Sequence, residues 1–577
     1  MKRKKTIRPL SLLILFFLFP LCAFAQTITV KGVVKDMNGE ALIGVSVLQV
    51  GTNNGTLTDI SGKYEIKVDK ATSLSFSYVG YEKKVISVAG KTNIDVVLSD
   101  NNKSLNEVVV VGYGTQRKEA VTGSVASVKG DVLKEIPAGN ITQALQGRVA
   151  GLDLQQNDTR PGATLQIRIR GTRSLSADNN PLIVLDGIPF SGSISDISPD
   201  DIKSVDILKD ASATAIYGSR GANGVILITT NKGSKGAAPH VNYSGTYGVG
   251  EAIYYPMMNS TEFNALRTAS GRYPTNGVDE SNDVNTNWQS LFYRNSIVQS
   301  HDLSVSGGNE KGNYKFGANF YTNQAVIPGQ DYTRYAIRGS ADQEIGNYIR
   351  IGFTSNTNFN VTNGASLGMY GVISMSPIAN PYNADGSLKR VVQMPMDQQF
   401  VLTRGVIDNL GDTWKDQKKA FGSYNSLYAE VKIPGVEGLK YRANLGANFN
   451  FSNAGNYTGV GVMNSSPSAA SSAGVSNSYT TNWAIENLLT YDKTFGKHRI
   501  NAVAMYSAEQ NFYNSSNVSA INIPTDNLQF YNLGQSNAAD ITLNPSYQGY
   551  TVWGLESWMG RVMYSYDDRY MISVTGR

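Results

Sequence analysis

Thiols, charges and long apolar runs are all scarce in this sequence of 577 residues. The single cysteine is Cys22, and a chain without other thiols suits an oxidising compartment. Charged residues make up 17%, against about 25% in soluble domains. Beyond the N-terminus no stretch approaches the roughly eighteen apolar residues of a membrane-spanning helix. This composition, with 57 glycines and 32 tyrosines, favours long strands of alternating character.

Catalytic and metal-binding signatures are also missing. The three histidines, His240, His301 and His498, lie far apart and share no metal-ligand spacing. The sequence contains no phosphate-binding loop, no nucleophile elbow and no zinc-protease motif. We therefore predict that the chain is not an enzyme and that it needs no metal or cofactor.

The first 25 residues have the layout of a cleaved signal peptide. Basic residues at 2–5 and 8 precede an apolar run, Leu10 to Phe19, and Ala23-Phe24-Ala25 forms a small-residue cleavage site. A membrane anchor would need about twice that apolar length. The whole chain has 51 basic and 46 acidic residues, and cleavage removes five basic ones. The exported chain is then neutral, which argues against nucleic acid as a partner.

Residues 26–100 are predicted to form a small β-sandwich, because short alternating strands follow one another with turn signals between them. The two D-x-x-G sequences, Asp36–Gly39 and Asp59–Gly62, match hairpin turns. As calcium loops they would lack the additional acidic ligands.

Residues 101–116 combine a polar linker with an extended segment, which is composed of Glu107, Val108, Val109, Val110, Val111, Gly112 and Tyr113. Four consecutive valines favour the extended state and the glycines end it. Two interpretations are open: a free strand that another protein can pair with, or the last strand of the preceding sandwich.

Residues 117–234 are predicted to be a mixed α/β domain. The pattern indicates a helix near Ile141–Leu145 capped by Asn140, a buried strand at Leu182–Leu185, a helix at Asp210–Tyr217 and a buried strand at Val225–Ile228. Its arginines are Arg168, Arg170, Arg173 and Arg220 among others. These four can pair with acidic groups on the inner wall of a surrounding barrel or with acidic groups within the domain, and the sequence does not decide between these alternatives.

Residues 235–577 change to long strands with a period of two. At 313–320, for example, Tyr, Phe and Ala alternate with Asn, Lys and Gly, and 439–447 and 558–566 behave alike. A soluble sandwich has the same period, but export and tyrosine-rich strand ends favour a membrane barrel with lipid outside and water inside. Polar stretches such as 269–288 and 463–480 are predicted to be external loops. Trp483 and Trp553 suit either sugar stacking or the aromatic girdles of the membrane interface.

Several quoted segments resemble a known family when they are taken together and in order. Residues 30–68 with "LSFSYVGY" resemble a carboxypeptidase-D regulatory-like domain, and "NEVVVVGYGTQRK" is similar to a TonB box. "ALQGRVAGLDL", "RPGATLQIRIRG", "PLIVLDGIPF" and "IKSVDILKDASATAIYGSRGANGVILITTNKG" resemble the plug of SusC/RagA outer-membrane proteins. The resemblance implies a mainly β protein, with a sandwich, a TonB box at Glu107–Tyr113, an α/β plug and the first part of a transmembrane barrel.

In function, the resemblance implies TonB-dependent import of an oligosaccharide, or else a peptide, across the outer membrane. The implied partners are TonB with ExbB and ExbD, a SusD-like surface lipoprotein and outer-membrane lipid. Rival functions are a signalling receptor, a siderophore or vitamin importer and a surface adhesin. Residues 235–577 suffice for roughly a dozen strands, whereas such barrels have about twenty-two. We therefore expect this sequence to be a fragment of a longer chain, unable to transport alone, or a gene remnant.

Overall fold

The computed structural model describes residues 27–577 except 38, 53, 71, 79–80, 100–107, 111–114, 118–123, 136–139, 157–159, 164, 365–372, 396–398, 401–410, 463, 465 and 568. The predicted signal peptide over residues 1–25 lies outside the described residues. Contacts divide the chain into two compact units, the first ending at Val108 and also including Arg117–Glu119. In the ranges just given, no helix is both long and apolar enough to cross a membrane.

The first unit is a β-sandwich with its own core. One sheet has the order β4-β1-β7 and the other β3-β2-β5-β6. Apolar side chains of alternating positions, among them Val30, Val47, Leu74 and Phe76, are fully buried between the sheets. The strands are β1 Thr27–Lys35, β2 Ser46–Gln49, β3 Gly55–Leu57, β4 Lys63–Asp69, β5 Ser73–Ser77, β6 Lys84–Ser87 and β7 Val96–Val97.

Tyr64 gives this core a dependence on alkaline pH. Its hydroxyl donates to the Ile94 carbonyl at 2.9 Å. Burial, with a smaller contribution from the Asp95 carboxylate, raises the pKa of Tyr64 to about 12. An unfolded tyrosine ionises near pH 10, so the stabilisation from the neutral Tyr64 hydroxyl is complete below about pH 10 and is lost as the pH rises towards 12.

Urea unfolding of the isolated first unit at about pH 8 and about pH 11.5 checks this expectation. The variant Tyr64→Phe is the control, because it keeps the ring and cannot ionise. We expect the wild type to lose more stability than the variant over this interval; an equal loss in both would contradict the assignment.

The plug segment, as we call the predicted residues 117–234, contains a five-stranded sheet of order β10-β15-β16-β13-β14. β15 lies antiparallel to both β10 and β16, while β13 is parallel to β16. A separate hairpin pairs β11 with β12. The strands are β10 Val125–Lys129, β11 Leu152–Gln156, β12 Leu165–Ile169, β13 Leu182–Leu185, β14 Ile188–Pro189, β15 Ile202–Leu208 and β16 Val225–Thr230. The α-helices are α2 Gly130–Leu133, α3 Ile141–Leu145 and α4 Ala211–Thr214. The 3-10 turns are η3 Ile194–Asp196, η4 Pro199–Asp201 and η5 Ala215–Gly221.

Two helices of this segment test the predictions closely. Asn140 caps α3 by accepting from the Gln143 amide, as expected. The helix predicted over Asp210–Tyr217 begins correctly after the Asp210 cap, but only Ala211–Thr214 is α-helical. The next turns are 3-10, interrupted at Gly218 with φ 61°.

The described part of residues 235–577 is dominated by one antiparallel sheet of twelve strands, the large sheet. Each strand pairs with the next long strand along the chain, and β28 pairs beside β27. The strands are β17 His240–Gly250, β18 Ser296–Gly308, β19 Gly312–Gln324, β20 Asp331–Ile345, β21 Ile349–Asn363, β24 Trp414–Lys432, β25 Leu439–Thr458, β26 Ser472–Phe495, β27 His498–Ile521, β28 Ile541–Leu543, β29 Gly549–Tyr566 and β30 Tyr570–Gly576.

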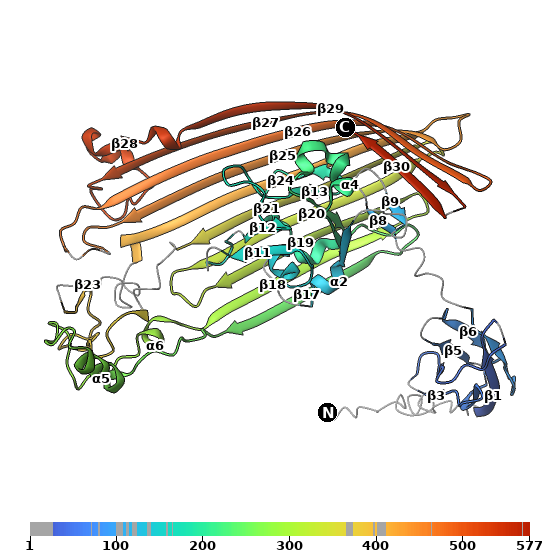
Figure 1. The fold of residues 1–577 in the computed structure, drawn as a ribbon, viewed down its shortest axis with the longest axis horizontal. Helices are drawn as coiled ribbons and strands as arrows, with labels where there is room; N and C mark the ends of the chain where they lie inside the picture. The colour runs from blue at the N-terminus through green and yellow to red at the C-terminus, as the bar shows by residue number, and fades with distance from the viewer. Residues whose placement is uncertain are drawn as a thin grey trace, which may run out of the picture. The chain divides into compact units, whose positions relative to one another are not determined.

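Short and long connections alternate along this sheet. Turns such as 346–348 and 496–497 join strands at one end, while 251–295, 364–413 and 522–548 join them at the other. The long connections carry α5 Ser260–Ser270, α6 Trp288–Phe292, the hairpin of β22 Val392–Gln393 and β23 Gln399–Phe400, and the 3-10 turns η6 Gly411–Thr413, η7 Leu533–Gln535, η8 Ala538–Asp540 and η9 Pro545–Tyr547. Figure 1 shows α5, α6, β23 and β28 at the same end of the sheet. The loop predicted over 463–480 ends earlier, because β26 begins at Ser472.

The two faces of the large sheet differ as the alternation predicts. On β19, Phe316 is exposed on one face, while Asn319 and Tyr321 are buried on the other. We call the face that exposes Phe316 the outer face and the opposite one the inner face. On the outer face, aromatic rings of five neighbouring strands form a row, with successive centroids 5.3–6.2 Å apart: Phe421, Phe451, Tyr479, Phe512 and Tyr550. Such a row is typical of the girdle of a membrane barrel.

Candidate functional site

The plug segment lies against the inner face of the large sheet, and this contact is the candidate functional site (Figure 1). The chain positions it through β15, which lies between β10 and β16 in the plug sheet and begins directly after the 3-10 turn η4. Asp201 is the last residue of that turn, and η4 thereby places its carboxylate at the border between plug segment and sheet.

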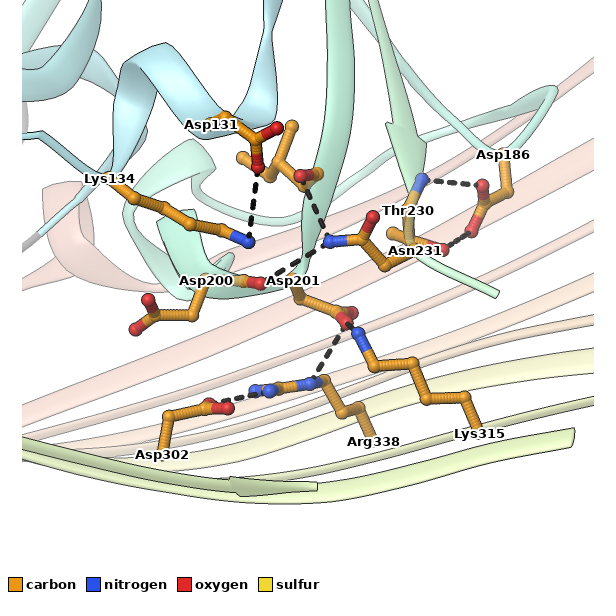
Figure 2. A network of polar contacts seen from close by, with 11 residues as sticks. Asp131, Lys134, Asp186, Asp200, Asp201, Thr230, Asn231, Asp302, Lys315 and Arg338 are labelled. Atoms are coloured by element: carbon orange, nitrogen blue, oxygen red, sulfur yellow. Dashed lines mark hydrogen bonds and ion pairs between the residues drawn. The ribbon is translucent and has the colours of Figure 1, made fainter. Parts of the chain in front are cut away.

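Asp201 is held by two cations from the large sheet. It lies 2.9 Å from Nε of Arg338 on β20 and 3.1 Å from Nζ of Lys315 on β19. Nη2 of Arg338 also donates to Asp302 on β18 at 2.5 Å. Figure 2 shows these side chains meeting between the two parts. We call these four residues, two acids and two bases, the ionic cluster.

The ionic cluster is largely removed from solvent. The side chains of Asp201, Arg338 and Asp302 are only 7%, 5% and 4% exposed. Burial raises the pKa of the Asp201 carboxyl, and Arg338 and Lys315 oppose that rise. Burial and the Asp302 carboxylate likewise raise the pKa of Asp200, which precedes it. Each charge is costly to bury alone, so the cluster is stable only while its members stay together.

A second polar contact lies beside the ionic cluster. The Asp196 carboxylate accepts from the Tyr424 hydroxyl of β24 at 2.7 Å and from the Asn360 amide of β21 at 3.0 Å. The Tyr424 ring packs against Phe190, with centroids 4.3 Å apart. Burial raises the pKa of Asp196, although these hydrogen bonds act in the opposite direction.

Towards the other side of the sheet the contact becomes apolar. Plug side chains that include Ile216, Tyr217 and Leu227 form one buried cluster with the inner face of three strands. The members from the large sheet are Leu488 on β26, Val503 and Met505 on β27, and Met559 on β29.

The structure decides between the alternatives for the four arginines. Arg220 forms an ion pair with Glu509 on β27, so it contacts the sheet. Arg168 donates to Thr172 and Gln166, and Arg173 donates to the Ala222 carbonyl, all within the plug segment. Arg170 adds its charge near Asp210, also within the segment.

The predicted TonB box is only partly described. Val108–Val110 form β8, which pairs with β9, Thr115–Arg117, in a two-stranded sheet. Glu107, Val111, Gly112 and Tyr113 lie outside the described residues. The assignment of this segment to TonB therefore stays a prediction.

The remaining candidates fall on both faces of the sheet. Trp483 lies on the outer face, and its indole donates to Gln510 at 3.2 Å. Trp553 shares the inner face of β29 with Met559 and Arg561 and is 41% exposed. The outer-face His301 ring stacks between Tyr243 and Phe320. Within the described ranges, no group of three His, Cys, Asp or Glu side chains is placed to hold a metal ion.

Sequence reasoning missed the ionic cluster. Its members come from η4, β18, β19 and β20 and are far apart in sequence. One signal in the sequence could have indicated it. Asp302, Lys315 and Arg338 are charged residues at positions that the period of two places on the inner face of their strands.

Comparisons with known proteins agree with this architecture. Residues 117–225 match the TonB-dependent Receptor Plug Domain, and residues 30–110 match the CarboxypepD_reg-like domain. The TonB-dependent receptor P3 of Formosa agariphila is 33% identical over 595 residues, covering 99% of this chain and 57% of the relative. The TonB-dependent receptor SusC of Bacteroides thetaiotaomicron is 38% identical over 322 residues, covering 54% of this chain and 32% of the relative.

Among solved structures, the RagAB peptide importer in its open-open state matches with a TM-score of 0.71 and 22% identity. The match covers 81% of this chain and 56% of that chain. This likeness confirms the fold class of plug and barrel. The chain spans about half the length of the curated relatives that it matches over nearly its whole length.

Proposed function

Since this chain is a TonB-dependent receptor of the SusC/RagA type and not an enzyme, we propose that the complete protein imports a large nutrient across the outer membrane. The observation that carries the proposal is a plug segment seated on the inner face of the sheet by breakable polar contacts. Such contacts close a lumen at rest and let it open under load.

We propose that the energy arrives mechanically, because the outer membrane holds no ATP. We propose that TonB, driven by ExbB and ExbD, pairs with Glu107–Tyr113 and pulls. In the described part of the chain, β8 pairs only with β9, which leaves its other edge available there. A TonB strand can add to that edge by backbone hydrogen bonds.

The substrate we propose is an oligosaccharide or, as the second choice, a peptide, delivered by a SusD-like surface lipoprotein. The inner face offers hydrogen-bonding groups and the half-exposed Trp553 ring, which suit sugar rings or peptide side chains. We further propose that the domain boundaries are those predicted: sandwich 26–100, linker and TonB box 101–116, plug 117–234 and barrel from 235.

Deleting the complete gene tests the function. We expect the deletion strain to lose growth on one member of a panel of glycans and peptides supplied as sole carbon source. Unchanged growth with altered transcription would instead indicate a signalling receptor. A defect confined to iron-limited medium would indicate a siderophore importer.

Changing Val109 to proline tests the pulling segment. Proline removes a backbone N–H and disfavours strand pairing, so growth on the identified nutrient should fall to the level of a tonB deletion. Val109→Thr is the matched control, because it keeps the N–H and a β-branched side chain. If Val109→Pro grows like Val109→Thr, the TonB box is misassigned.

A further inference from the structure

The plug segment meets the large sheet along two borders of different chemistry. The polar border, at β18–β21, contains the ionic cluster and the bond from Asn360 to Asp196. The apolar border, at β26–β29, contains Leu488, Val503, Met505 and Met559, with the Arg220–Glu509 ion pair beside them. β24 lies between them and contributes Tyr424 to both kinds of contact.

The two borders respond differently to separation. Water can solvate the charges of the polar border as they part, which offsets much of the lost attraction. Separating the apolar border exposes apolar area at about 25 cal/mol per Å², and water offers no compensation. Under the same load the polar border therefore opens first.

The polar border contains a cavity that is large enough for water. A cavity of about 580 Å³ lies between the plug segment and β17–β19, a size that is usual for ligand sites. Its lining is mainly polar and includes Lys134 and Asp200 of the plug segment together with Asn242, Ser300, Ser304 and Lys315 of the sheet. Two members of the ionic cluster, Asp302 and Lys315, line it directly.

The chain also directs the load to this border. The segment after the TonB box enters the plug sheet at β10, an edge strand, and continues into α2. Gly130 of α2 packs against the Ile202 carbonyl so closely that a Cβ would lie 1.8 Å from its oxygen. Ile202 follows Asp201 directly, so a pull on β10 and α2 acts beside the ionic cluster.

We propose that the plug segment opens along β17–β19 while it stays seated against β26–β29, so that the polar cavity widens into the route of the substrate. This inference rests on the proposed TonB-driven import. The route suits an extended, uncharged chain whose hydroxyl or amide groups exchange hydrogen bonds with the serines and asparagines of the wall. An apolar solute would find few matching partners there, because most of the lining side chains are polar.

Thiol labelling in cells tests the route. Residues 1–577 contain one cysteine, Cys22, in the predicted signal peptide, and labelling of the complete protein without an introduced cysteine gives the background. Ser304→Cys places a thiol at the cavity, and Met505→Cys places one at the apolar border; both positions are buried, at 8% and 4% exposed. Ser300→Cys and Val503→Cys repeat the pair in case one variant fails to assemble.

The complete gene carrying each variant is expressed in tonB-positive and tonB-deleted cells, on medium containing peptone and a glycan hydrolysate. A membrane-impermeant fluorescent maleimide is the probe. We expect TonB to raise labelling at position 304 several-fold and to leave labelling at 505 unchanged. Equal gains at both positions, or a gain at 505 alone, would overturn the proposal.

Cross-linking a Val109→Cys variant to a cysteine-bearing TonB distinguishes a failure of the proposed route from a failure of the proposed TonB coupling. If the cross-link forms and labelling at 304 does not depend on TonB, the route is wrong and the proposed import stands. If no cross-link forms, the TonB coupling itself fails, and the route falls with it.

Discussion

Changing Arg338 to methionine should make the receptor leak. Arg338 bridges Asp201 of the plug segment and Asp302 of the sheet, at 2.9 and 2.5 Å, and all three side chains are almost fully buried. Methionine leaves two buried carboxylates with Lys315 as the remaining cation of the cluster. Removing one partner of a buried ion pair costs about 3–5 kcal/mol. Because the pair of Arg338 and Asp201 joins the large sheet to the plug segment, its loss weakens the attachment of the plug segment to the sheet.

The leak is measured as sensitivity of cells to vancomycin, which an intact outer membrane excludes. Arg350→Met is the matched control. Arg350 also pairs on the sheet, with Asp342 at 2.8 and 2.9 Å, but both residues belong to the sheet. We expect sensitivity in Arg338→Met cells and resistance in Arg350→Met cells at equal receptor levels. Equal behaviour of the two variants would show that the ionic cluster does not hold the plug segment.

Changing Phe76 to alanine should destabilise the sandwich by about 3–5 kcal/mol, the usual cost of emptying a buried aromatic site. Phe76 is fully buried, faces Val47 across β2 and β5, and packs edge-on against Tyr64 with ring centroids 5.3 Å apart. The surrounding strands hold this site open, so the cavity cannot close completely.

Urea unfolding of the isolated first unit, followed by circular dichroism, gives the change in free energy of unfolding. Val85→Ala is the control, since Val85 is 56% exposed on β6 of the same sheet. Its substitution should change stability by no more than about 0.5 kcal/mol. A Phe76→Ala variant as stable as Val85→Ala would contradict the core described above.

Local patterns predicted the strands because period-two alternation reports directly which face is buried. Tyr314, Phe316 and Phe320 were expected on one face of residues 313–320, and the structure places them there. The cap at Asn140 was equally local. The 3-10 turns after Thr214 were not predicted, because Gly218 and the packing of Ile216 and Tyr217 on the sheet override the helical pattern.

Contacts between distant segments could not be read from the sequence. Asp201 meets Lys315 and Arg338 only because η4 and two sheet strands converge, and no local pattern encodes that convergence. The two tryptophans show the same limit. A shift of one residue exchanges the faces of a strand, and only the pairing register sets Trp483 outside and Trp553 inside.

Pulling on the TonB box tests the central claim most directly. The complete receptor is held in a lipid bilayer, and the periplasmic domain of TonB is attached to a force probe. We predict that the plug yields before TonB detaches, with an extension well short of the roughly 400 Å that residues 114–230 would span if all were drawn out, because the apolar border stays seated. Detachment of TonB without any extension, in the wild type and in Val109→Pro alike, would contradict a plug opened by force through Glu107–Tyr113.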